Sequence, residues 1–62
     1  MRIALTLIVG KTVLIKIPHN SGVHERIVAE IDITANVIKL QHINSTYYNW
    51  YELNKCEILK II

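Results

Sequence analysis

Residues 47–59 read Tyr47-Tyr48-Asn49-Trp50-Tyr51-Glu52-Leu53-Asn54-Lys55-Cys56-Glu57-Ile58-Leu59 and contain every Tyr and Trp of the 62-residue chain, which has no Phe. The aromatic residues at 47–51 are typical of a strand. The next segment, 52–55, is too short for an α-helix and predicts a single 3₁₀ turn. The apolar run after it predicts a closing strand over residues 56–62. We also expect the binding surface of the protein in this aromatic stretch.

Length and composition predict one small domain, covering residues 1–62, that self-associates. A chain of this size is near the lower limit for folding without a disulfide, a metal or a partner. Cys56 is the only cysteine, so an internal disulfide is excluded and a reducing, cytoplasmic compartment is expected. Hydrophobic residues make up 52% of the chain, more than so small a core can bury. We therefore expect a homo-oligomer built on outward apolar side chains, at Ile8, Leu14, Val28 and Ile43.

The charge of the chain argues against a dedicated DNA packager, and the length of its apolar run argues against a membrane protein. The formal net charge is +2 and the pI is about 8.9, which is only mildly basic. The apolar run at residues 3–9 is shorter than a typical signal-peptide core and far shorter than a membrane span. No membrane partner is expected.

Two-residue alternation of apolar side chains predicts strands along the rest of the chain. The predicted strands cover residues 1–9, 12–17, 24–34 and 37–43. Turns are expected at Gly10 and at the segments rich in turn-forming residues, 18–22, 34–36 and 44–46. Strict alternation in the strand over 24–34 places four residues on the inner face: Ile27, Ala29, Ile31 and Ile33. The fold class is therefore all-β, with five or six short antiparallel strands.

This order of parts resembles an SH3-like barrel of the Tudor and KOW sort. The resemblance rests on Val9-Gly10-Lys11-Thr12-Val13-Leu14-Ile15-Lys16, on Glu25-Arg26-Ile27-Val28-Ala29-Glu30-Ile31, on Val37-Ile38-Lys39-Leu40, and on Trp50-Tyr51-Glu52-Leu53 followed by Cys56-Glu57-Ile58-Leu59. It covers about residues 9–62 and leaves residues 1–8 as an extra N-terminal strand. The resemblance implies a small barrel with a 3₁₀ turn before the last strand. Such barrels host several functions, so the resemblance does not fix one.

The first candidate site is the aromatic group, Tyr47, Tyr48, Trp50 and Tyr51. Alternation places Tyr48 and Trp50 on one face of the strand and the other two tyrosines on the opposite face. One interpretation is structural, with Trp50 filling the barrel and the tyrosines framing its rim. The other is a recognition surface for a protein partner, since Tyr and Trp bury large areas at low entropic cost.

The second candidate site is a basic face. Lys16, Arg26 and Lys39 are predicted at outward positions on neighbouring strands, and beside a tyrosine they would suit single-stranded nucleic acid. Acidic residues interleave with them, which is also typical of an ordinary solvated surface. Nucleic-acid binding is therefore the alternative to protein binding.

Metal binding and catalysis are not expected. The histidines and Cys56 lack the close spacing of a structural zinc motif, and no base is evident beside the lone thiol. The sequence predicts a non-enzymatic binding module without a cofactor, for a protein partner or, alternatively, nucleic acid.

Overall fold

A computed structural model of the protein describes residues 5–62 and contains five strands and two 3₁₀ turns. In chain order, the elements are η1 (Leu5–Ile8), β1 (Thr12–Lys16), β2 (His24–Asp32), β3 (Val37–His42), β4 (Tyr48–Glu52), η2 (Leu53–Lys55) and β5 (Glu57–Ile61). The all-β prediction is confirmed. The closing sequence of strand, 3₁₀ turn and strand is also as predicted from the aromatic stretch.

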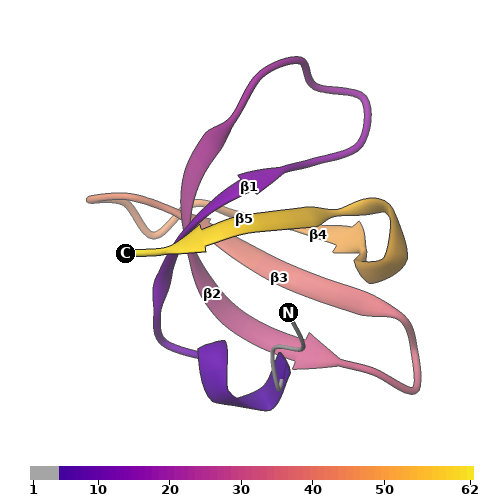
Figure 1. Cartoon of the computed structure of the whole chain (residues 1–62). Coiled ribbons are helices and arrows are strands. Elements are labelled where there is room, and N and C mark those ends of the chain that lie inside the picture. Colours follow the sequence, from indigo (N-terminus) through magenta and orange to yellow (C-terminus); the bar gives the residue numbers. More distant parts are fainter. Residues whose placement is uncertain (1–4) are drawn as a thin grey trace.

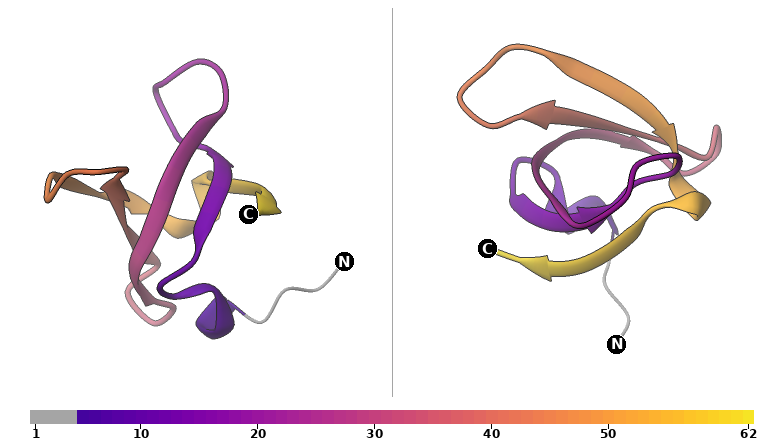
Figure 2. Two further views of the ribbon diagram at one scale, coloured as in Figure 1. Left: turned by 90° about the vertical axis from the view of Figure 1, so that its left-hand side faces the viewer. Right: turned by 90° about the horizontal axis from the view of Figure 1, so that it is seen from above.

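The strands form one antiparallel sheet in the order β4-β3-β2-β1-β5. The sheet is strongly twisted and curved, so that β5 passes in front of β4 in Figure 1, and Figure 2 shows the same curvature from two other sides. β4 and β5 are the two end strands and do not pair with each other in the described part of the chain. The sheet is therefore not closed into a barrel.

The core lies on the concave, inner face of this sheet. β1 contributes Val13 and Ile15, β3 contributes Ile38 and Leu40, and all four side chains are fully buried. These residues alternate along their strands as predicted, because successive side chains of a strand point to opposite faces. The remaining buried apolar side chains are Ile8, Ile17 and Val28.

The strict alternation predicted for β2 is wrong, and the reason is a β-bulge. Val28 pairs with Leu40, but the next pair is Glu30 with Lys39, so Ala29 is an extra residue without a partner. A bulge reverses the phase of all side chains that follow it. Val28, expected outside, lies before the bulge and is fully buried. Ile33, expected inside, lies beyond the end of β2 in the following turn and is 59% exposed. Of the four predicted inner residues, only Ile31 packs against the core.

The extra strand predicted over residues 1–8 is wrong where the structure describes it. Leu5–Ile8 is a 3₁₀ turn, and residues 1–4 lie outside the described residues. Gly10 has a positive φ of 88° and donates to Val28 O at 2.7 Å. The chain therefore turns sharply before β1, and Ile8 is buried under the end of the sheet instead of facing outward as predicted.

The predicted turns hold the strands in register. Asn36 and Asn44 adopt positive φ values of 56° and 59°, which Asn tolerates better than most residues. Asp32 supports the first of these turns, since its Oδ1 accepts a 2.9 Å hydrogen bond from the N–H of Ala35. The β3–β4 hairpin places the aromatic strand beside Lys39.

Candidate binding surface

β4 presents two of its aromatic side chains to solvent on the outer face of the sheet. Tyr48 is 47% exposed and Trp50 46% exposed, whereas Tyr51 packs against the core. The register explains this division, because Tyr51 pairs with buried Ile38 and Trp50 pairs with Lys39, and paired residues share a face. The predicted sharing of one face by Tyr48 and Trp50 is confirmed.

Trp50 does not fill the interior of the sheet. The interpretation that this indole plugs a barrel is wrong, because the inner positions of β4 belong to Asn49 and Tyr51. Aliphatic side chains of β1, β2 and β3, together with Ile8 and Ile17, fill the core without it.

Lys39 joins the two exposed rings into one surface. Its Nζ lies 4.0 Å from the ring centroid of Tyr48 and 5.8 Å from that of Trp50. Both distances are within the range of cation–π attraction. This attraction restricts the conformations of the lysine side chain and of the two rings. We refer to Tyr48, Trp50 and Lys39 as the aromatic strip.

Acidic side chains surround the aromatic strip. Glu30 pairs directly with Lys39 across the strands, and Asp32 and Glu52 both pair with Val37. A hollow of about 310 Å³ beside Trp50 is lined by Glu30, Ile31, Asp32, Ile33 and Val37. The surface therefore combines apolar area with charges of both signs, and it is not a basic face.

The other predicted site residues are not part of the strip. Tyr47 precedes β4, is 62% exposed and contacts His42 edge-on, with ring centroids 5.1 Å apart. Arg26 pairs with Val13 and His42 on the inner face of the sheet, where its Nη1 donates to Glu25 O at 2.8 Å. The outward position predicted for Arg26 is therefore wrong.

Lys16 is also distant from Lys39. Its neighbour Ile15 pairs with His24 at the start of β2, whereas Lys39 pairs with Glu30, six residues further along the same strand. At about 3.3 Å per residue, this separation is on the order of 20 Å along the strand. The structure does not bring the three predicted cations together.

Sequence reasoning missed the outer backbone edge of β4, which no other strand among residues 5–62 pairs with. Two backbone bonds set the pattern of the β3–β4 ladder: His42 N–H to Tyr47 O and Leu53 N–H to Asn36 O, both 2.9 Å. In an antiparallel ladder, hydrogen-bonded pairs alternate with pairs that are not hydrogen-bonded. The odd-numbered residues of the segment 47–53 therefore bond to β3 through their backbone. The even residues Tyr48, Trp50 and Glu52 point their backbone groups away from the sheet. Periodicity alone could not reveal this edge, since it depends on the position of β4 in the sheet.

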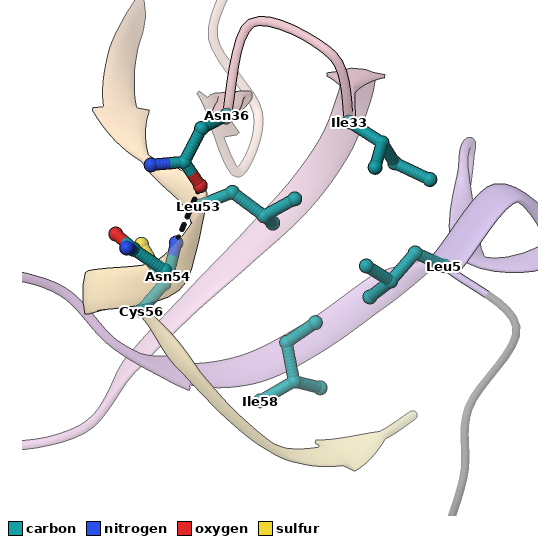
Figure 3. Close-up of a pocket in the computed structure, with 7 residues that line it drawn as sticks. All are labelled: Leu5, Ile33, Asn36, Leu53, Asn54, Cys56 and Ile58. Carbon is teal, nitrogen blue, oxygen red and sulfur yellow. Dashed lines mark hydrogen bonds between the residues drawn. The ribbon is translucent and has the colours of Figure 1, made fainter.

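A second hollow, of about 460 Å³, lies at one end of the sheet and is mostly apolar. Figure 3 shows its lining residues: Leu5, Ile33, Asn36, Leu53, Asn54, Cys56 and Ile58. Burial raises the pKa of the Cys56 thiol, which donates to Glu52 O at 3.4 Å. A thiol with a raised pKa is a poor nucleophile at neutral pH.

Residues 5–62 contain no cluster of three or more His, Cys, Asp or Glu side chains that could hold a metal ion. Over the same residues, no helix is both long enough and apolar enough to cross a bilayer. No protein-family model, curated protein or solved structure matches this chain.

Proposed function

We propose that this chain is a non-enzymatic protein-binding module that contacts its partner through the aromatic strip. The observation that carries this proposal is the pair of half-exposed rings of Tyr48 and Trp50, held side by side under the Lys39 amine. Exposed Tyr and Trp are enriched at protein interfaces because they combine a large apolar area with a polar tip. We also propose that the module works in the cytoplasm and self-associates.

The arrangement of the strands supports a relationship with small SH3-like barrels. β5 lies next to β1, and a 3₁₀ turn joins β4 to β5. The curvature of the sheet around a single core is the arrangement that such a barrel requires. We propose an open barrel of this kind, with the aromatic strip on its outer surface.

Nucleic-acid binding remains the alternative function, but the charges favour it less. Single-strand binding needs a basic groove that follows the phosphate backbone beside stacking rings. Arg26 lies on the opposite face and Lys16 far along the sheet, while Glu30, Asp32 and Glu52 lie near the strip. Repulsion between these carboxylates and phosphates opposes binding.

Fluorescence anisotropy with labelled single- and double-stranded oligonucleotides separates the two functions. We expect no binding at about 50 mM salt, where phosphate contacts are strongest. Micromolar affinity that falls steeply at about 200 mM salt would instead establish the nucleic-acid function, since that dependence reports counterion release.

Affinity capture from a cell extract tests the protein-binding function directly. Wild-type protein, Trp50→Ala and Tyr47→Ala serve as baits, with circular dichroism as the check of folding. Tyr47→Ala is the matched control, because it removes an exposed ring outside the aromatic strip. We expect a specific partner on the wild-type and Tyr47→Ala baits and its loss on Trp50→Ala. Equal capture by all three baits would contradict a role for the strip.

A further inference from the structure

The two end strands of the sheet differ in how well they are protected against pairing. The free edge of a sheet exposes unpaired N–H and C=O groups, which natural proteins block with bulges, Lys or Pro. β5 has both a bulge, at Leu59 between the pairs of Ile15 with Ile58 and Leu14 with Lys60, and a lysine, Lys60. β4 has an unbroken register with β3 and contains neither Lys nor Pro. β4 is therefore the edge open to another strand.

We propose that β4 pairs with β4 of a second copy of this chain, antiparallel and around a two-fold axis at Trp50. This inference rests on the proposed function, because it names the partner of the same surface. Backbone groups that point outward must pair with one another, and in β4 these belong to Tyr48, Trp50 and Glu52. The oxygen of Glu52 already accepts a weak bond from the Cys56 thiol, at 3.4 Å, and has a second lone pair for the partner strand. The register centred on Trp50 uses all three residues. In it, Trp50 pairs with Trp50 of the second copy, and Tyr48 pairs with Glu52 of the second copy.

Charge complementarity supports this register. Residues directly opposite in an antiparallel pair have Cβ atoms about 5 Å apart and share a face. The Glu52 carboxylate of one copy would thus lie beside Tyr48 of the other, and the Lys39 amine is 4.0 Å from the centroid of that ring. The two-fold axis produces this Lys39–Glu52 contact twice. Within residues 5–62 of one chain, the ion pair of the Glu52 carboxylate is with Lys55, at 3.5 Å between exposed side chains.

The surroundings of β4 also provide room for the second copy. A hollow of about 190 Å³ lies at the Glu52 end of the strand, between it and the turn at Pro18 and His19. In the centred register, Tyr48 of the other copy projects beside this hollow. The two Trp50 side chains would be neighbours on the outer face, which buries the apolar area that a single chain leaves exposed.

Sedimentation equilibrium at about 10 to 200 µM protein tests the pairing, because self-association depends on protomer concentration. We expect a dimer for the wild-type protein. Lys39→Glu and Glu52→Lys should each weaken dimerisation about tenfold, since each places like charges opposite one another at two symmetric positions. The double variant Lys39→Glu/Glu52→Lys should recover an affinity within about threefold of the wild type, because it restores opposite charges at both positions.

Two further variants complete the experiment. Glu57→Lys makes the same charge change on β5 and should leave the dimer unchanged. Tyr48→Pro removes an outward N–H at the edge while every β3–β4 bond remains, and it should abolish the dimer in a chain that circular dichroism shows to be folded.

A wild-type monomer over this range would overturn the inference, as would a dimer insensitive to both single charge changes. An assembly that Glu57→Lys disrupts would also overturn it, because β5 would then be the pairing edge. A monomer that still captures a partner through Trp50 would refute the pairing and the proposed self-association while leaving the protein-binding function standing. A dimer with the expected charge pattern and no captured partner would support the pairing. It would also contradict the binding of a different protein by the aromatic strip.

Discussion

The Oδ1 atom of Asn36 accepts a hydrogen bond of 3.0 Å from the backbone N–H of Asn54, 18 residues further along the chain. The backbone oxygen of Asn36 accepts a second bond, of 2.9 Å, from the N–H of Leu53. Figure 3 shows the first of these bonds at the edge of the apolar hollow. One residue of the β2–β3 turn thus fixes the start of η2, and η2 sets the direction in which the chain leaves β4.

Substitution of Asn36 should destabilise the protein through both its side chain and its backbone. Asn36→Ala loses the bond to Asn54 and places Ala at a positive φ of 56°, so we expect a loss of about 2–3 kcal/mol in unfolding free energy. Asn36→Gly keeps the backbone conformation without strain and should lose about 1 kcal/mol. Urea denaturation of the two variants measures the difference. Equal losses would contradict a contribution from the left-handed backbone.

The positions of two apolar residues, one inside β2 and one in the turn after it, predict opposite outcomes of substitution. Val28→Ala removes methyl groups from a fully buried position and should cost about 2 kcal/mol. Ile33→Ala acts at a position that is 59% exposed and should change the stability by less than about 0.5 kcal/mol. Thermal unfolding of both variants tests this, and a larger loss for Ile33→Ala than for Val28→Ala would contradict the buried position of Val28 and the exposed position of Ile33.

The contact between Lys39 and Tyr48 should be measurable as a coupling energy. The amine lies 4.0 Å from the ring centroid at a solvent-exposed site, so attraction of about 0.5–1 kcal/mol is expected. A double-mutant cycle of Lys39→Met and Tyr48→Leu isolates this energy from the losses of the single variants. It should be measured in the monomer, at concentrations below any self-association. A coupling energy of zero would mean that the lysine is solvated and does not hold the ring.

Cys56 should react slowly with alkylating reagents in the folded protein. Burial raises the pKa of its thiol, and the thiolate is the reactive form. Iodoacetamide labelling near neutral pH, followed by mass spectrometry, should be several times slower than in urea. The same shift makes stability depend on pH. The folded state holds the proton more tightly, so this contribution is complete below the ordinary thiol pKa and is lost as the pH rises through the raised value.

Cys56→Ala is the control for that pH dependence. It should remove the part of the alkaline loss of stability that comes from the raised pKa of the thiol. Identical labelling rates in the folded and unfolded states would contradict the partial burial of Cys56.

Several predictions from sequence followed from rules that act locally. The strand over residues 37–43, the turn at Asn36 and the 3₁₀ turn before the last strand were all predicted and are confirmed. Alternation, turn-forming residues and the shortness of a segment are properties of neighbours in the chain, so a single sequence reveals them.

The errors share a different physical origin. The bulge at Ala29 arises because β2 must pair with β1 on one side and with β3 on the other while the sheet bends. The position of Ile8 depends on how Gly10 turns the chain against Val28. The separation of Lys16, Arg26 and Lys39 depends on register across three strands. None of these relationships exists between sequence neighbours.

The sequence by itself thus determined the all-β class, the order of the strands along the chain and the concentration of aromatic residues in one strand. Only the tertiary structure decided which of those residues face solvent, that Lys39 lies over two of them, and that β4 is an unprotected edge. Side-chain periodicity is local, whereas strand order, register and bulges arise when segments distant in sequence must satisfy their hydrogen bonds together.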